Sequence, residues 1–255
     1  MGEAKPRPPR SRFPSGDDRF WLEITDDGSR TLVRTDSGVS FHSGSGAATE
    51  TRHVYLDNSG VSERLRSGTP TRVLEVGLGS GMALLMTLEL ALRHAAPLDY
   101  VAVEHCWPTA SVLEQLRPAT WVADPELAAS FLQWRRSLGE DPVEGRHFWS
   151  PAARLRVTVA LCDARSWGAD DPQPFDAIYF DPFAPQDSPE LWECGLLLRL
   201  RRALADGGRL VTYCVSRQAR QRFGDAGFRV RRVPGPPGGK REVLVAEPDR
   251  AGGGS

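Results

Sequence analysis

The sequence has little of what marks a secreted, membrane-bound or metal-binding protein. Its 255 residues include four cysteines, which lie far apart and never in C-x-x-C spacing, so we expect neither a zinc site nor a disulfide framework. No apolar run approaches the roughly 20 residues that a membrane span needs. The first residues, MGEAKPRPPRSRFP, lack the apolar core of a signal peptide. Together these absences predict a reduced, cytoplasmic protein without a membrane partner.

Lysine is almost missing as well, since Lys5 and Lys240 are the only two. The formal net charge of −1 does not by itself indicate a nucleic-acid partner, but the charge is unevenly distributed. Residues 186–255 contain 13 basic and 8 acidic residues, whereas residues 1–185 carry a net charge of −6. Genome composition is one explanation of the arginine excess, and a phosphate-contacting surface in the last quarter is the other.

Length and composition favour one large α/β core, because 40% of the residues are hydrophobic. We expect a disordered, basic, proline-rich tail at residues 1–18 and a flexible tail at 249–255. Residues 19–68 read as short strands (20–24, 32–34 and 39–41) followed by a lid helix at about 47–56. The main domain is expected at 69–248.

The most informative stretch is FDAIYFDPFAP, residues 175–185. Its apolar run has the length of a strand buried on both faces. Asp181 and Pro182 end that strand, because proline has no amide to donate and favours an extended residue before it. A carboxylate is thereby fixed at the carboxyl end of a central strand, where ligands bind in open α/β sheets. A plain turn whose aspartate accepts from nearby amides is the alternative.

A second motif is TRVLEVGLGSG, residues 71–81, which reads as a strand followed by a tight turn at Gly77, Gly79 and Gly81. The spacing is G-x-G-x-G and not the dinucleotide fingerprint G-x-G-x-x-G, because residue 82 is methionine. Glu104 follows the next strand, 23 residues beyond Gly81. An acid at that place accepts hydrogen bonds from ribose hydroxyls, so we expect an adenosine-containing cofactor.

The remaining pattern predicts a doubly wound sheet of about seven strands. Helices are expected at 82–93, 108–118, 125–138, 190–204 and 217–226, and strands at 73–76, 100–103, 155–161, 177–180, 209–214, 228–233 and 242–246. The last two strands are joined by a short Pro/Gly loop and should be antiparallel, whereas the earlier crossovers are parallel and right-handed. This is the arrangement of class I S-adenosylmethionine methyltransferases, here with a small N-terminal β-rich and lid extension.

Five segments make the resemblance specific: GAATETRHVYL, VLEVGLGSGMALL, FDAIYFDPFAPQDSPELW, LADGGRLVTYCVSRQARQRFGDAGFRV and GGKREVLVA. Together they are similar to the MnmC-like tRNA methyltransferases. The resemblance implies methyl transfer from S-adenosyl-L-methionine to the amine of 5-aminomethyl-2-thiouridine at the wobble position of the tRNA anticodon loop. Many members also carry an FAD-dependent oxidoreductase, but this sequence has no second glycine fingerprint, so we expect the stand-alone form without FAD or metal.

The resemblance and the motifs assign roles to individual residues. Asp181 is the expected catalytic residue, which orients the amine, and Tyr55 is a lid aromatic that could stack on the base together with Phe183. The arginines at 217, 220 and 222 are further phosphate-contact candidates, with a solvated helix face as the alternative. The cofactor-binding candidates are Glu75, Gly77, Gly79, Gly81, Glu104 and Asp163, and the substrate-binding candidates are Glu50, Pro182, Phe183, Lys240 and Arg241.

Two other functions stay open at this point. An N-methyltransferase or aminopropyltransferase for a small amine would use the same fold, with more acids around its substrate. A methyltransferase-like RNA-binding protein without catalysis is the second, although the complete set of glycines, Glu104 and Asp181 argues against it. Fold alone does not choose among these functions.

Overall fold

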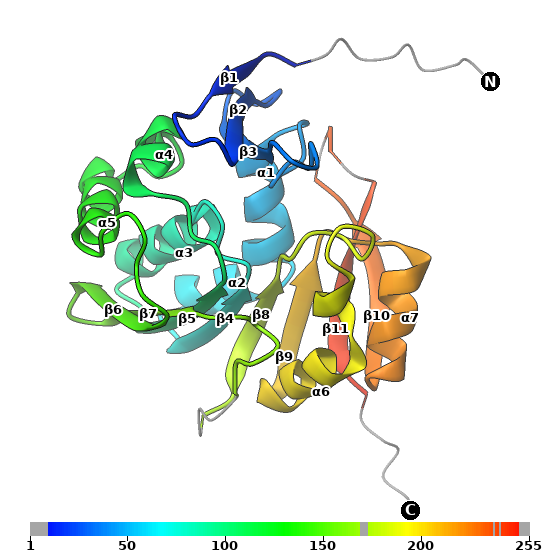
Figure 1. The fold of residues 1–255 in the computed structure, drawn as a ribbon. Helices are drawn as coiled ribbons and strands as arrows, with labels where there is room; N and C mark the ends of the chain where they lie inside the picture. Colours follow the sequence, from blue (N-terminus) through cyan, green and yellow to red (C-terminus); the bar gives the residue numbers. More distant parts are fainter. Residues whose placement is uncertain (1–9, 169–172, 237, 240, 250–255) are drawn as a thin grey trace, which may run out of the picture.

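The computed structural model describes residues 10–168, 173–236, 238–239 and 241–249. Within these residues, eight strands form one sheet in the order β10-β11-β9-β8-β4-β5-β7-β6, and three more form a small antiparallel sheet, β1-β2-β3 (Figure 1). The strands are β1 (Arg12–Pro14), β2 (Phe20–Ile24), β3 (Arg30–Arg34), β4 (Thr71–Val76), β5 (Leu98–Glu104), β6 (Gly145–Ala152), β7 (Leu155–Leu161), β8 (Phe175–Phe180), β9 (Leu204–Thr212), β10 (Phe228–Pro234) and β11 (Glu242–Pro248).

The central strands are parallel, and the two ends of the sheet are not. β7, β5, β4, β8 and β9 pair in parallel, whereas β11 runs antiparallel to both β9 and β10, and β6 runs antiparallel to β7. The expected class I methyltransferase arrangement, with an antiparallel pair at the end, is confirmed. The sheet has eight strands because β6 adds one that the sequence pattern did not indicate.

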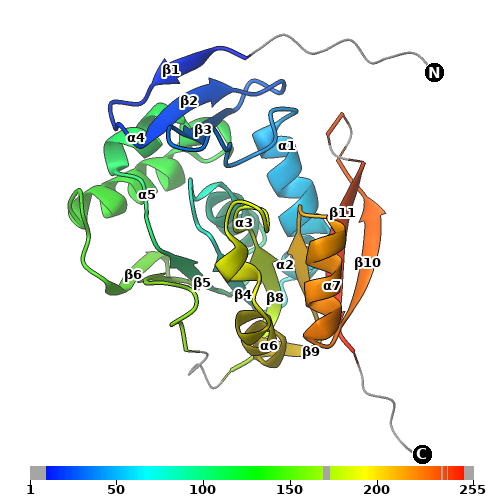
Figure 2. The same ribbon diagram turned by 45° about the vertical axis from the view of Figure 1, so that its right-hand side comes forward.

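Helices cover both faces of the large sheet (Figures 1 and 2). Side chains on β8 alternate between two cores, since Tyr179 packs with α3 on one face and Phe180 with α6 and α7 on the other. α3 is buried from Met82 to Ala91 because it lies beneath other helices, so it is apolar on nearly every side. The helices are α1 (Ala47–Thr51), α2 (Val61–Arg66), α3 (Met82–Arg93), α4 (Ala110–Gln115), α5 (Pro125–Ser137), α6 (Cys194–Ala203) and α7 (Arg217–Asp225).

Three further helical turns lie beside these helices: a π-helical turn η1 (Arg52–Asp57) and two 3₁₀ turns, η2 (Pro118–Thr120) and η3 (Pro189–Trp192). The expected helix at 190–204 is therefore divided. Glu193 has extended backbone (ψ 147°), which ends η3 and lets α6 begin at Cys194. The expected helix at 108–118 is shorter, and α2 was not expected, since it has only six residues, three of them buried.

The N-terminal sheet lies over the carboxyl edge of the large sheet, next to α1 and α4 (Figure 2). Part of the expected disordered tail is ordered, because β1 pairs with β2. Residues 1–9 and 250–255 of the two expected tails lie outside the described residues. The strand expected at 39–41 is wrong, since only Ser40 forms an isolated bridge, to Val33. No helix of the described chain is long and apolar enough to cross a membrane.

Candidate functional site

Hydrogen bonds continue beyond the ends of the central strands and align the residues that follow them. The amide of Asp181, after β8, donates to the carbonyl of Val76, and the amide of Gly77, after β4, donates to the carbonyl of Val103, both at 2.9 Å. Glu104, the last residue of β5, lies along the same edge. Because strand order reverses between β4 and β8, this edge is the place where an open α/β sheet binds ligands.

The turn between β4 and α3 requires its glycines. Gly77, Gly79 and Gly81 have positive φ angles of 92°, 51° and 76°. A Cβ atom at Gly77 would lie 2.8 Å from the carbonyl oxygen of Asp181, and one at Gly79 would lie 3.1 Å from the ring of Phe41. The turn thus leaves bare backbone at the start of a 12-residue helix, which lets a ligand approach closely.

Glu104 connects this turn to the neighbouring strand. Its Oε2 accepts from the amide of Gly79 at 2.9 Å, and its Oε1 accepts from the amides of His105 and Cys106 at 2.8 and 2.7 Å. A carboxylate has about four lone-pair positions, so these bonds leave capacity for a ribose hydroxyl. Glu104 thus lies at the end of its strand and fixes the glycine turn, while its contact with a ribose stays a prediction.

The other two acids expected near the cofactor differ from Glu104. Glu75 is buried within β4, where its Oε2 accepts from the hydroxyl of Tyr100 at 2.8 Å. Burial raises the pKa of the Glu75 carboxyl well above its ordinary value. Asp163, in the turn after β7, forms an ion pair with Arg165 at 2.6 Å, whose hydrogen bonds lower the pKa of Asp163. Glu75 is thus paired inside the protein, while Asp163 is at the edge.

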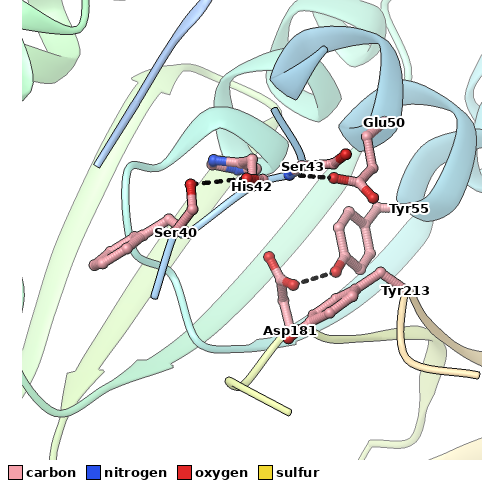
Figure 3. Close-up of a pocket in the computed structure, with 8 residues that line it drawn as sticks. Ser40, His42, Ser43, Glu50, Tyr55, Asp181 and Tyr213 are labelled. Carbon is pink, nitrogen blue, oxygen red and sulfur yellow. Dashed lines mark hydrogen bonds between the residues drawn. The ribbon is translucent and has the colours of Figure 1, made fainter. Parts of the chain in front are cut away.

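A pocket lies directly beside Asp181, between the lid and the sheet (Figure 3). It draws its walls from the segment after β3, from α1 and η1, from the end of β8 and from the residue after β9. Its lining residues are Ser40, Phe41, His42, Ser43, Glu50, Tyr55, Asp181 and Tyr213. Two carboxylates and two phenols in one pocket make it a site for a group that donates hydrogen bonds.

Each carboxylate in the pocket is held by a donor of the protein. The hydroxyl of Tyr55 donates a hydrogen bond to Oδ1 of Asp181. The amide of Ser43 donates to Oε2 of Glu50 at 2.7 Å. Glu50 and Tyr55 are both buried, with 5% and 2% of their surface exposed. The lid therefore contributes one carboxylate and fixes the orientation of the other.

The ionisation of the pocket follows from its burial. Burial, and next the charge of Asp181, raise the pKa of the Tyr55 phenol well above its ordinary value. The same two causes raise the pKa of Tyr213. Burial lowers the pKa of His42 from 6.5 to about 4, and its Nδ1 lies 3.1 Å from the hydroxyl of Thr31. At neutral pH the phenols are therefore protonated donors and the imidazole is uncharged.

The lid presents Glu50 and Tyr55 together because of the π-helical turn. In an α-helix of 3.6 residues per turn, residues five apart point about 140° away from each other. η1 instead has hydrogen bonds that span five residues, as the amide of Asn58 to the carbonyl of His53 illustrates at 3.2 Å. Such turns are rare in proteins as a whole, and those that occur often lie at functional sites. Here both side chains reach the pocket (Figure 3).

Pro182 and Phe183 continue the edge beyond Asp181. The carbonyl of Pro182 accepts from the Tyr213 hydroxyl at 3.1 Å. The Phe183 ring packs edge-to-face on Phe41, with centroids 5.3 Å apart, and the Arg34 guanidinium lies 5.6 Å from its centroid. The end of β3 and the segment after it thus cover Phe183, so a base that stacks on this ring has to displace Phe41 or Arg34.

The basic candidates lie on two surfaces. Lys240 falls outside the described residues; Arg241 is exposed, and its carbonyl accepts from the Gly235 amide at 2.9 Å in the loop between β10 and β11. His53 of η1 contacts the carbonyl of Pro234 at 2.8 Å, which connects this loop to the lid. The α7 candidates are separate: Arg217 and Arg220 line a shallow hollow on α7, with Gln221 and Gly224, and Arg222 is exposed on the same helix.

Sequence reasoning missed Tyr213, His42 and the amide of Ser43. Tyr213 follows a buried strand, where an aromatic residue is typical of the core, so its position carried no separate signal. His42 and Ser43 lie in an irregular segment whose path depends on contacts with Glu50 and Thr31. Only the tertiary structure brings these groups to Asp181.

The edge fits an adenosine-containing cofactor. The glycine turn brings bare backbone to this edge, and Glu104 places a carboxylate at the end of the next strand. Within residues 10–168, 173–236, 238–239 and 241–249, no cluster of three histidine, cysteine or acidic side chains is arranged to hold a metal ion.

Comparison with known proteins gives the edge a family context. Residues 128–249 match a family described as S-adenosyl-L-methionine-dependent methyltransferase. A curated relative from Ralstonia nicotianae, named tRNA 5-methylaminomethyl-2-thiouridine biosynthesis bifunctional protein MnmC, is 30% identical over 229 residues, which are 88% of this chain and 34% of the relative. The protein of the same name from Delftia acidovorans is 30% identical over 84% of this chain and 33% of the relative. The chain thus spans about a third of these relatives.

Among solved structures, the crystal structure of MNMC2 from Aquifex aeolicus is similar, with a TM-score of 0.70 and 25% sequence identity. The match covers 89% of this chain and 69% of that chain. The similarity therefore extends over most of this chain.

Proposed function

Since this chain belongs to the class I S-adenosyl-L-methionine-dependent methyltransferases related to MnmC, we propose that it methylates the amine of 5-aminomethyl-(2-thio)uridine at the wobble position of tRNA. The product is 5-methylaminomethyl-(2-thio)uridine. The observation that carries this proposal is that Asp181 contacts both the pocket and the glycine turn. The Asp181 carboxylate faces the pocket, while its backbone lies directly against Gly77 of the cofactor turn.

The cofactor is held by the glycine turn at residues 77–81 and by Glu104, with Asp163 at the end of the next strand. When bound, S-adenosyl-L-methionine supplies a methyl group on a positively charged sulfur. Displacement from such a sulfur needs no redox centre or metal ion, so the contribution of the protein is to align the amine. We assign Glu75 a supporting role, because it is paired with Tyr100 beneath the turn.

Asp181 is the residue proposed to touch the reacting amine. Its Oδ1 is occupied by the Tyr55 hydroxyl, which fixes the plane of the carboxylate. Asp181 then accepts an N–H of the amine and directs the nitrogen toward the cofactor. Its negative charge favours the protonated amine, whereas burial of the pocket favours the neutral, reactive form. The high pKa of Tyr55 excludes that phenol as the base at neutral pH.

The tRNA partner is proposed from the lid and the basic loop. A wobble base that enters the pocket has to leave its stack, as unpaired loop bases do when proteins read them. Phe183 and Pro182 line its path, and Lys240 and Arg241 are proposed to contact anticodon-loop phosphates. The bond between His53 and Pro234 places that loop next to the lid. A tRNA substrate puts the enzyme in the cytoplasm.

The test is methyl transfer from labelled S-adenosyl-L-methionine to tRNA that carries the aminomethyl group, followed by mass spectrometry of the nucleosides. We expect a gain of one methyl group on the modified wobble uridine. Unmodified tRNA of the same sequence is the control. Transfer to neither tRNA by folded protein that binds the cofactor overturns the proposal.

One observation favours a second candidate function. The pocket contains both Glu50 and Asp181, and two carboxylates in a small pocket suit a free amine or polyamine as well as a nucleoside amine. A small-amine N-methyltransferase or aminopropyltransferase would give product with polyamines in the same assay and would be indifferent to tRNA. A non-catalytic RNA-binding protein would bind tRNA and transfer nothing.

A further inference from the structure

The three glycines of the turn after β4 leave spaces where side chains would otherwise project, and different groups fill them. The space at Gly77 faces backbone atoms, and the space at Gly81 faces the ring of Phe131, which is fully buried. The space at Gly79 faces the ring of Phe41, 3.1 Å from the position of a Cβ atom. Phe41 is only half-buried. Of these three glycines, Gly79 is therefore the one that faces a partly exposed side chain.

The ring of Phe41 also contacts the substrate side of the edge. It packs edge-to-face on Phe183, with centroids 5.3 Å apart, and it lines the pocket beside Asp181. Phe183 is the ring on which the wobble base is proposed to stack. One side chain thus lies against the bare backbone of the cofactor turn and against the proposed platform of the base.

The backbone that carries this ring is held independently of the ring. The amide of Phe41 donates to the carbonyl of Leu32 at 2.8 Å, and Ser40 forms a bridge to Val33. The ring itself packs edge-to-face on Phe20, with centroids 5.7 Å apart. Because the main chain is bonded to β3 and the side chain is half-buried, the ring can change its rotamer while the segment stays in place.

We propose, resting on the proposed function, that Phe41 is a positioning residue that both ligands displace, the cofactor at Gly79 and the base at Phe183. The first ligand to bind has to break the contacts of the ring with both surfaces. The second ligand then meets a surface that is already uncovered, so it binds more tightly than it does alone. The two sites are thereby coupled, and the coupling has the same size in both directions.

This coupling orders the reaction. The apparent affinity of a ligand falls in proportion to the fraction of molecules in which its site is open, and a first ligand that opens the site removes this reduction. Protein that already holds the methyl donor therefore admits the wobble base in preference to protein that does not. The ring of Phe41 makes the approach of the base depend on the cofactor, although the two ligands contact different residues.

The experiment measures the binding of aminomethyl-tRNA with and without S-adenosyl-L-homocysteine, which lacks the transferred methyl group and cannot react. Wild-type protein should bind this tRNA about tenfold more tightly when S-adenosyl-L-homocysteine is present, and the tRNA should tighten the binding of S-adenosyl-L-homocysteine by the same factor. In Phe41→Ala both ratios should fall to about one. Each ligand alone should then bind about tenfold more tightly than it binds to wild-type protein, because its site is always open.

Arg34→Ala is the matched control. The Arg34 guanidinium lies 5.6 Å from the centroid of the Phe183 ring, but no atom of Arg34 lies within 4 Å of the Cβ position at Gly79. This variant uncovers part of Phe183 without changing the glycine turn, so its ratio should stay at about tenfold. Phe41→Leu is a second variant if the alanine variant fails to fold. It keeps an apolar side chain against Phe20 and removes the ring, so its ratio should fall below that of wild-type protein.

The outcomes separate the two proposals. Unchanged ratios in the Phe41 variants, or weaker binding of each ligand alone, mean that the ring is a fixed wall and overturn its displacement. Absence of coupling in wild-type protein overturns it as well. Each of these results leaves the proposed function intact if wild-type protein methylates aminomethyl-tRNA. Failure of folded, cofactor-binding wild-type protein to methylate this tRNA overturns the proposed function, and the role of Phe41 with it.

Discussion

The edge proposed to bind the cofactor (the cofactor edge) and the pocket proposed to bind the amine (the amine pocket) meet at Asp181, yet they are built in different ways. The cofactor edge follows from consecutive elements: a strand, a glycine turn, a helix and the next strand, with Glu104 only 25 residues from Gly79 along the chain. The pocket joins groups as far apart as Tyr55 and Asp181, which are separated by 126 residues. A local motif therefore builds the edge proposed to bind the cofactor, while tertiary packing assembles the pocket proposed to bind the amine.

The strongest test of this division is Asp181→Ala, because Asp181 belongs to both regions. Loss of its side chain should lower single-turnover methyl transfer on the order of 10²–10⁴-fold, the range for a positioned acid–base group. Cofactor affinity should hardly change, since the backbone of Asp181 is what contacts Gly77. Single-turnover kinetics and calorimetry with S-adenosyl-L-methionine measure the two effects.

Asp181→Asn sharpens the same test. It keeps a carbonyl acceptor for the amine and cannot take a proton. Activity in Asn with none in Ala means that orientation is the main contribution, whereas equal loss means that charge or proton acceptance is. Near wild-type turnover in Asp181→Ala would leave Asp181 as a turn residue only.

Gly77→Ala should have the converse effect to Asp181→Ala, because it should weaken cofactor binding directly. An alanine there needs φ near 92° and brings its Cβ within 2.8 Å of the Asp181 carbonyl. Backbone strain of this kind costs about 1–3 kcal/mol, so we expect cofactor affinity to fall roughly tenfold to hundredfold by calorimetry. Gly68→Ala is the control, because Gly68 has a similar φ of 72° with nothing within 4 Å. Equal losses in both variants would contradict a local effect.

Tyr55→Phe tests the pocket without altering a charge. The variant loses the donor that fixes the Asp181 carboxylate, and a lost hydrogen bond to a charged group corresponds to about 1.5–3 kcal/mol. We expect turnover to fall roughly tenfold with unchanged cofactor affinity. Tyr179→Phe is a matched control, since Tyr179 is equally buried and its hydroxyl lies 3.4 Å from Thr87, outside the pocket. Similar turnover in both variants argues against a positioning role.

Arg241→Ala tests whether a positively charged side chain near the pocket attracts the tRNA phosphates. If Arg241 contacts a phosphate, the variant should bind tRNA a few-fold more weakly and lower the slope of log K against log salt by about 0.7–0.9. Arg156→Ala, on β7 near the other end of the strand order, should leave the slope unchanged. An unchanged slope in both would assign the contacts to another surface, such as Arg217 and Arg220.

The smallest expected effect concerns His42 and stability. Because burial lowers its pKa from 6.5 to about 4, the unfolded chain binds more protons between these values. The free energy of unfolding should therefore fall as pH decreases from 6.5 toward 4. In His42→Gln this loss should be reduced. The drop in melting temperature between pH 7 and pH 5 should be smaller in the variant than in the wild-type protein by roughly 2–4 °C. Identical pH profiles for the two proteins would contradict a neutral imidazole at this half-buried position.

The difference between the two regions also explains what the sequence could predict. The buried strand before Asp181, the glycine turn and Glu104 follow from short-range patterns, and the structure has all of them at one edge. β6 was missed because it is an edge strand that buries only Trp149, so its sequence lacks apolar periodicity. Tyr213 and Ser43 were missed because long-range contacts alone bring them to the pocket.

The expected lid helix shows the same limit within one element. Its start at Ala47 follows from the Gly-Ala-Ala-Thr-Glu pattern, and its continuation to residue 56 was expected to be α-helical. No local signal announces the π-helical turn η1, since it depends on how the helix packs against the sheet. Helical spacing alone would have separated Glu50 from Tyr55, and the packed structure brings them together.

The π-helical turn η1 also determines how many residues separate Glu50 from Tyr55. A π-helical turn is an α-helix that has gained one residue while both flanks keep their direction. Deleting Arg52, which is exposed, would restore an α-helical spacing of four between the acid and the tyrosine and keep them on one face. The number of residues between Glu50 and Tyr55 then indicates whether the lid contains an α-helix or the π-helical turn, whichever residues lie between them. In related sequences, a spacing of four or five would distinguish an ancestral helix from one that carries the insertion.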